Sequence, residues 1–362
     1  MRCLVYIGLS VLGINAATAG ELSSAYLRGS RAYEDGPSYQ IAPSLPSYEP
    51  APAPYTPPTA EAYPVAAAAT QPGYSFEAGA RYWYSTGKLA KDLFDDPRSS
   101  NSLNSRLTYD GLTAHAFEAF GRINLPNGLF FKGFAGIAGL RNGRLNDEDF
   151  PPALVPYSST MSDQRAGRLD YAAADFGYTF AINQRLSLSP FGGYAFLGET
   201  TSAYGCTQMA TNPFVCIPSI ATNVLAITED ARFHAARVGL MGEFRILDRL
   251  TLTAEAAWIP FAMIQATDSH WLRIGTTPGS FSGPIPESGN GSGVQLEALL
   301  SYQVWNCFNV GVGGRYWRID TKGTGDLEQN VVGITSPMAQ PMNFTTERYG
   351  AFVQGSYRFN MM

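Results

Sequence analysis

From residue 74 onward, apolar and polar residues alternate along the chain with a period of two. The stretch 251–258, TLTAEAAW, places Leu, two Ala and Trp on one face, and two Thr and a Glu on the other. The stretches 310–317 and 349–359 repeat the pattern. Successive side chains of a β-strand point to opposite faces. The alternation therefore predicts strands with one face toward lipid and the other toward a polar interior.

Ten such stretches can be counted, at 74–86, 104–124, 129–142, 166–182, 186–201, 230–246, 251–268, 292–306, 308–322 and 345–359. Short turns at 125–128, 182–185, 247–250 and around 306–307 alternate with five connections that we expect to run to about 20 residues or more. We predict an all-β fold over 74–362, a ten-stranded antiparallel transmembrane β-barrel with long extracellular loops. A soluble β-sandwich is the competing fold, but it needs no long loops at one end only.

Composition supports a barrel in a membrane. Aromatic residues make up 13% of the chain and charged residues 15%, against about 25% charged residues in typical soluble domains. No segment after the N-terminus has the roughly 18 uninterrupted apolar residues that a membrane helix needs. The formal net charge of -5 argues against nucleic acid as a partner.

Two segments precede the predicted barrel. Residues 1–19 combine Arg2, an apolar stretch and the small residues Ala17-Thr18-Ala19, which predicts a secretory signal peptide. Residues 20–73 are rich in Pro, Ala and Tyr, and such a segment cannot bury enough apolar surface to fold. We expect a disordered periplasmic leader, with binding to the cell wall or to a partner as the alternative.

Cys206 and Cys216 lie in one predicted loop. In an oxidising compartment they could close a small disulfide, and we predict this bridge. Cys307 is the odd cysteine and falls in a predicted tight turn. The alternative is that all three are free thiols.

The residues that could carry chemistry lie in two short motifs, Asp147-Glu148-Asp149 and Asp268-Ser269-His270. Residues i and i+2 of a strand share a face, so each motif aims two ionisable side chains to the same side of the rim. Three carboxylates and one imidazole converging there would make a site that activates water. The same groups could in principle ligate a metal, but we predict none.

The barrel region resembles the omptins, ten-stranded outer-membrane proteases of Gram-negative bacteria. The similarity covers roughly 76–359, where GKLAKDLFDDPRSSNSLNSRLTYD, NGRLNDEDF, GRLDYAAADFGYTF, RFHAARVGLMGEF and ATDSH occur in the matching order. The resemblance implies an aspartate–histidine endopeptidase that needs no metal. It implies that His270 is the general base, that Asp268 orients it, and that Asp147 holds the water, with support from Asp149.

The resemblance is incomplete where omptins recognise basic substrates. Their groove carries an acid in the first loop, which Asp92 matches after a one-residue shift, with Lys91 as the alternative at that place. A second acid is expected two residues before Asp268, where this chain has Ala266. The residues that could compensate for it are Asp95, Asp96, Asp163, Glu229 and Asp230.

The resemblance also implies that activity depends on lipopolysaccharide, with Arg232 as a candidate contact and no other cofactor. We expect a monomer in the outer membrane of a Gram-negative bacterium, with the site extracellular, the leader periplasmic, and peptides or proteins at the cell surface as substrates. Two other functions stay open. One is a catalytically inactive surface barrel that serves as an adhesin or structural protein. The other is a lipid A-modifying hydrolase, a class that usually needs a Ser–His pair facing lipid.

Overall fold

The computed structural model describes residues 73–95, 102–150 and 155–361. The predicted signal peptide and all of the predicted leader before residue 73 lie outside the described residues. The described residues all belong to one compact unit. Within it, no helix is long and apolar enough to cross a membrane.

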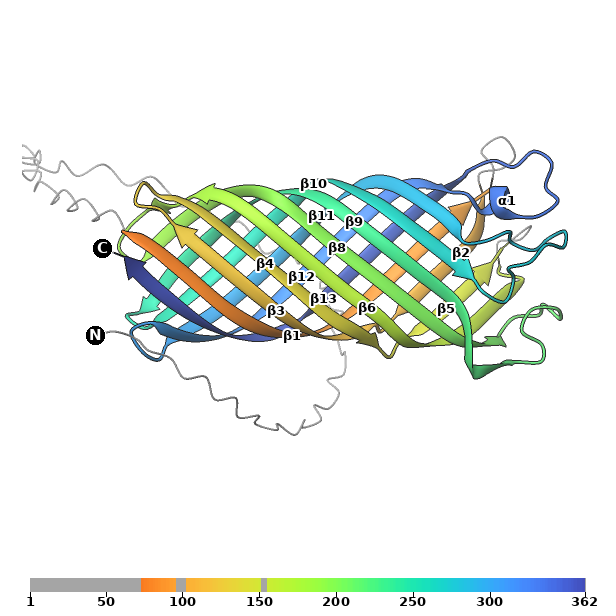
Figure 1. The fold of residues 1–362 in the computed structure, drawn as a ribbon, viewed down its shortest axis with the longest axis horizontal. Helices are drawn as coiled ribbons and strands as arrows, with labels where there is room; N and C mark the ends of the chain where they lie inside the picture. Colours follow the sequence, from red (N-terminus) through yellow and green to blue (C-terminus); the bar gives the residue numbers. More distant parts are fainter. Residues whose placement is uncertain (1–72, 96–101, 151–154, 362) are drawn as a thin grey trace, which may run out of the picture. The chain divides into compact units, whose positions relative to one another are not determined.

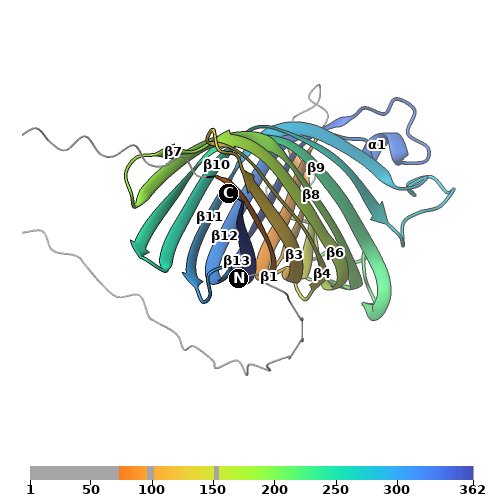
Figure 2. The same ribbon diagram turned by 60° about the vertical axis from the view of Figure 1, so that its left-hand side comes forward.

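Antiparallel strands close into a ring, which Figures 1 and 2 show from two directions. The elements are β1 (Tyr74–Phe94), β2 (Leu103–Asp110), β3 (Thr113–Asn124), β4 (Leu129–Arg141), β5 (Arg144–Asp149), β6 (Ser158–Tyr178), β7 (Phe180–Ala181), β8 (Leu186–Gln208), β9 (Ile220–Leu247), β10 (Leu250–His270), β11 (Ile285–Gln303), β12 (Phe308–Gly325), α1 (Leu327–Asn330) and β13 (Gln340–Met361). β1 pairs with β13 and with β3, which closes the barrel.

The thirteen strand segments of the described residues amount to ten strands, because three strands are interrupted. β2 and β3 both pair with β1, β4 and β5 both pair with β6, and β6 continues as β7 along β8. Gly111 (φ 67°), Asn142 (φ 62°) and Gly143 (φ 106°) lie at two of the breaks, and Gly and Asn tolerate this backbone conformation best. The predicted ten-stranded barrel is confirmed.

The two ends of the barrel differ. At one end, here called the turn end, short turns join neighbouring strands, and Tyr74 pairs with Met361. At the opposite end, here called the loop end, the strands run further than predicted. β1 extends to Phe94, and β9 begins at Ile220. The strands thus take up part of each expected loop, because polar stretches can continue a ladder by backbone pairing without any apolar alternation.

The outer surface carries a belt of exposed apolar side chains on every side of the barrel. Its members include Tyr82, Tyr84, Phe117, Ile137, Phe176, Tyr194, Val238, Leu240, Trp258, Phe261, Val294, Leu296, Val312, Tyr349 and Val353. Beyond this belt, the outward positions of β10 become polar, as Gln265 and Thr267 illustrate. A lipid-facing band of this kind is what a membrane-spanning barrel requires.

The interior is filled by ion pairs and aromatic rings. Arg315 donates to Glu118 and to Glu297, each at 2.7 Å, and its guanidinium lies 5.2 Å from the ring centre of Trp83. Buried charges are stable only when paired in this way. A cavity of about 310 Å³ opens toward the turn end. Layers of such side chains separate it from the loop end, where the predicted site residues lie.

Candidate active site

The residues of the two acidic motifs come together at the loop end. Asp147 and Asp149 lie on β5, and Asp268 and His270 end β10, on the other side of the barrel. All four line one cavity of about 30 Å³, which has room for one or two water molecules. β5 and β10 are not hydrogen-bonded to each other, so the two motifs become neighbours only because the sheet closes into a barrel.

His270 is oriented by Asp268. The Nε2 atom of His270 lies 3.0 Å from Oδ2 of Asp268, and both side chains are buried. The ring of Phe281 packs edge-on against the imidazole, with ring centres 5.4 Å apart. When Nε2–H donates to the carboxylate, Nδ1 carries the free lone pair and becomes the basic atom of the ring.

The carboxylates on β5 favour the protonated form. Burial, together with the charges of Asp149 and Asp268, raises the pKa of Asp147 to about 7, although His270 and Arg273 oppose the shift. Burial also raises the pKa of Asp149, against the opposing charges of Arg273 and His270. Asp147 can therefore gain or lose a proton near neutral pH, which suits a group that handles water.

The pair on β10 favours the charged form. Burial alone would raise the pKa of Asp268, but the charges and hydrogen bonds of His270 and Lys91 outweigh it and hold this pKa well below its usual range. Burial likewise opposes protonation of His270, yet the charge and hydrogen bond of Asp268 and the charge of Asp147 raise its pKa. Asp268 is therefore an ionised partner that stabilises an imidazolium at His270.

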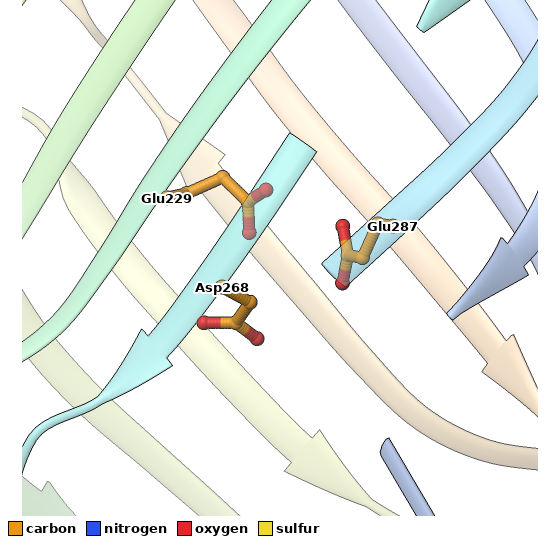
Figure 3. Close-up of side chains that lie close together, drawn as sticks. All are labelled: Glu229, Asp268 and Glu287. Atoms are coloured by element: carbon orange, nitrogen blue, oxygen red, sulfur yellow. The ribbon is translucent and has the colours of Figure 1, made fainter. Parts of the chain in front are cut away.

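Lys91 joins this pair to two further acids. Its Nζ atom lies 2.6 Å from Asp268, 2.7 Å from Glu229 and 2.7 Å from Glu287, and all four side chains are buried. Figure 3 shows the three carboxylates pointing toward one another from neighbouring strands. Their ligating atoms lie within 4.8 Å of one another, a spacing that could hold a cation, and here the ammonium group of Lys91 takes that position.

Strand register explains why these acids meet. Glu229 is the direct cross-strand partner of Asp268, and Glu287 is the partner of Ala266. Opposed residues of antiparallel strands place their side chains on the same face. Glu287 thus places a carboxylate next to Ala266, the position where the omptin resemblance leads us to expect an acid. Glu229 was among the expected compensating acids, but Glu287 was missed because its register with β10 is not visible in the sequence.

Asp92 does not line the cavity, contrary to the expectation from sequence. The alternation of β1 turns Lys91 inward, so Asp92 points outward and forms an ion pair with Arg106 at 2.6 Å. Arg232 also faces outward and lies 3.3 Å from Asp230. Asp163 is similarly exposed and paired with Arg165. Of the other acids considered, Asp95 accepts a hydrogen bond from Ser102, and Asp96 lies outside the described residues.

Arg273 is a further cavity residue that the sequence did not single out. It follows β10 closely, lines the cavity, and places its guanidinium 4.2 Å from the ring centre of Phe281. Its charge lowers the pKa of both Asp147 and Asp149 against the effect of burial. A lone arginine in a loop carries no sequence signal of this role.

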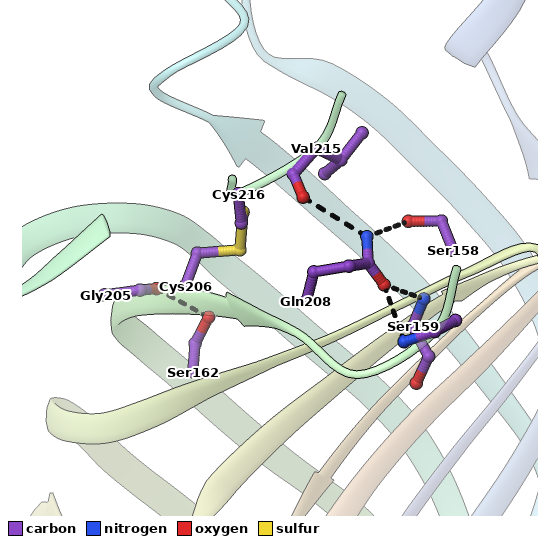
Figure 4. Close-up of a disulfide and its surroundings, with 9 residues drawn as sticks. Ser158, Ser159, Ser162, Gly205, Cys206, Gln208, Val215 and Cys216 are labelled. Atoms are coloured by element: carbon purple, nitrogen blue, oxygen red, sulfur yellow. Dashed lines mark hydrogen bonds between the residues drawn. A yellow bond between two sulfur atoms is a disulfide. The ribbon is translucent and has the colours of Figure 1, made fainter. Parts of the chain in front are cut away.

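A disulfide joins Cys206, near the end of β8, to Cys216 in the connection that leads to β9, with Cα atoms 5.6 Å apart (Figure 4). Gln208 ties this connection to the start of β6, because its side-chain amide donates to Ser158 and its carbonyl oxygen accepts from the backbone of Ser159. The bridge therefore belongs to a well-bonded part of the loop end.

No protein-family model and no curated protein matches the chain. Among solved structures, the outer membrane protease OmpT from Escherichia coli matches with a TM-score of 0.62 at 13% sequence identity, over 79% of this chain and 97% of that chain. The toluene transporter TbuX of Ralstonia pickettii (TM-score 0.31, 9% identity, 80% of this chain, 90% of that chain) and Ail of Yersinia pestis (TM-score 0.22, 11% identity, 78% and 98%) are too dissimilar to guide interpretation. The likeness to OmpT shows a shared barrel fold, and it agrees with the omptin resemblance of the sequence.

Proposed function

We propose that this protein is an outer-membrane endopeptidase that hydrolyses peptide bonds with a water molecule activated by Asp147 and His270. The observation that carries the proposal is the single cavity lined by both acidic motifs, with Nε2 of His270 3.0 Å from Asp268. The shared fold with an outer membrane protease supports it. The surroundings of Asp147, Asp268 and His270 are compatible with the roles that the mechanism below gives them.

In the proposed reaction, a water molecule between Asp147 and His270 attacks the carbonyl carbon of the substrate. Its proton passes to Nδ1 of His270, and Asp268 stabilises the resulting imidazolium through its ionised carboxylate. Collapse of the tetrahedral intermediate returns the proton to the leaving amine. Asp149 supports Asp147, and Arg273 provides positive charge at the same cavity.

The proposal extends to the location of the site. The apolar belt supports a barrel in an outer membrane, and we infer that the loop end lies outside the cell, where substrates reach it. Lipopolysaccharide would then surround the outer half of the barrel, where the exposed Arg232 is a candidate contact. Arginines at such an interface also extend toward water without specific binding.

The direct test is cleavage of a mixed peptide library by the refolded barrel with lipopolysaccharide added. Asp147→Ala and His270→Ala should each abolish cleavage. His115→Ala is the matched control, because His115 lies on the outer surface, where its Nδ1 meets the hydroxyl of Tyr82 at 2.5 Å. Cleavage that survives in either cavity variant would refute the mechanism, and equal loss in the control would point to misfolding instead.

One observation favours a second candidate, a catalytically inactive surface barrel. Oδ2 of Asp268 is shared, and Nζ of Lys91 is nearer to it, at 2.6 Å, than Nε2 of His270, at 3.0 Å. A carboxylate held mainly by an ammonium group would support the imidazole less. A folded wild-type protein that cleaves no peptide at any pH between about 5 and 9 would favour this function.

A further inference from the structure

Lys91 reaches across the barrel to the acids. It lies on β1, whereas Glu229, Asp268 and Glu287 lie on the adjacent strands β9, β10 and β11. Its ammonium group bonds all three carboxylates at 2.6–2.7 Å. One oxygen of each carboxylate is nevertheless buried without a hydrogen-bond partner. The cluster is therefore rich in acceptors and holds one cation, which the protein itself supplies.

This cluster is continuous with the catalytic cavity. Lys91 and Glu287 line the same space as Asp147 and His270, and Asp268 contacts both the ammonium group and the imidazole. A side chain next to the bond being cut would enter this space. The rest of the lining combines Ser105 and Arg273 with four apolar side chains, those of Leu93, Leu107, Ile285 and Leu327.

Electrostatics keep the ammonium group in place. Three buried carboxylates without a cation would repel one another and lose solvation at the same time. The three carboxylates raise the pKa of Lys91 well above its usual value, although burial opposes this. A substrate ammonium or guanidinium group would have to displace a cation that already has three partners.

We propose that Lys91 is a specificity-determining residue, whose ammonium group fills the subsite that Glu229, Asp268 and Glu287 would otherwise offer to a basic substrate side chain. The inference rests on the proposed endopeptidase function. The enzyme then prefers a small, uncharged side chain beside the cut, because the cavity of about 30 Å³ must also hold the attacking water and keeps no free acid for a basic group. Lys91 takes part in substrate choice and leaves the chemistry to the four residues at the water.

The first test compares cleavage of matched peptides that carry Ala, Ser, Lys or Arg beside the cut. The wild type should favour Ala and Ser over Lys and Arg in kcat/KM by at least about tenfold. Lys91→Ala opens the subsite and should reverse this order. Lys91→Met removes the charge but keeps most of the side-chain length, so it should cleave Lys and Arg peptides no better than the wild type does. A wild type that prefers Lys or Arg, or a Lys91→Ala variant with unchanged preference, would overturn the proposal.

Because removal of Lys91 also shifts the protonation of His270, each variant is compared on the plateau of its own pH profile. Lys91→Ala changes the formal charge of the cluster from -2 (one cation and three carboxylates) to -3. Should this variant fail to fold, Lys91→Ala with Glu229→Gln restores -2 and leaves two carboxylates for a guest cation. The same reversal of preference is expected in the double variant.

The second test needs no catalysis. Binding of n-butylammonium, a probe for a lysine side chain, is measured by calorimetry on the refolded barrel. Binding is expected for Lys91→Ala or the double variant, and none for the wild type or Lys91→Met. Absence of binding in the opened variants would overturn the proposal. Binding in these variants combined with an inactive wild type would refute the endopeptidase and leave the cation subsite established.

Discussion

The replacement Asp268→Asn tests the pairing at the centre of the site. It keeps the shape of the side chain and removes the charge that lies 3.0 Å from Nε2 of His270. At that distance, an effective dielectric constant of about 20 gives an attraction of about 5.5 kcal/mol between the carboxylate and an imidazolium. Lys91 shares the carboxylate and reduces this value. Since about 1.4 kcal/mol corresponds to a tenfold change in rate, we expect kcat to fall between about 10² and 10⁴-fold.

The same replacement should move the pH profile. The charge of Asp268 raises the pKa of both His270 and Asp147, so its removal lowers both. The rise of kcat/KM with pH should therefore occur at lower pH than in the wild type. Lys91 keeps its contacts with Glu229 and Glu287, so the variant is expected to fold.

The assay is cleavage of a fluorogenic peptide by the refolded barrel, measured across pH for kcat and KM separately. Asp320→Asn is the matched control, because Asp320 is an exposed partner of Arg318 at 2.7 Å and lies away from the cavity. A decrease in kcat of less than about tenfold, or a profile that does not move, would refute the assigned role of Asp268.

Three further predictions concern the same cavity. In the wild type, kcat/KM should rise with pH through about 7. The reason is that the productive state needs ionised Asp147, whose pKa is raised to about 7, and neutral His270, whose pKa is also raised. A pH–rate profile checks this. The pKa of Asp147 rises from 3.8 to about 7 on folding, so the folded protein holds this proton more tightly than the unfolded chain does. The contribution of protonated Asp147 to folding stability is therefore complete below pH 3.8 and is lost as pH rises through about 7. Asp147→Asn should therefore resist thermal unfolding better than the wild type at alkaline pH and equally at acidic pH. Arg273→Met should lower kcat by about tenfold or more and move the acid limb of the pH–rate profile to higher pH. The reason is that the charge of Arg273 lowers the pKa of Asp147 and Asp149. An acid limb that does not move would contradict the position of Arg273 beside these two carboxylates.

Asp92 and Lys91 show why the residues that face the cavity are hard to predict. Both candidates fit the sequence, and they differ by one position. A shift of one residue along a strand moves a side chain to the opposite face. The sequence around these two residues is polar and shows no apolar alternation, so it does not indicate which of the two side chains faces the barrel interior. The structure turns Lys91 inward and leaves Asp92 paired with Arg106.

The strand pattern, the turn positions and the two acidic motifs can be predicted from the sequence alone. These features are local, because apolar alternation and turn chemistry act over a few residues. Which side chains share the cavity depends on how the whole chain folds. Lys91 meets Glu229 and Glu287 across the interior, at sequence separations of 138 and 196 residues. Such contacts depend on barrel closure, strand register and the direction of each side chain, and none of these is encoded in any one segment of the chain.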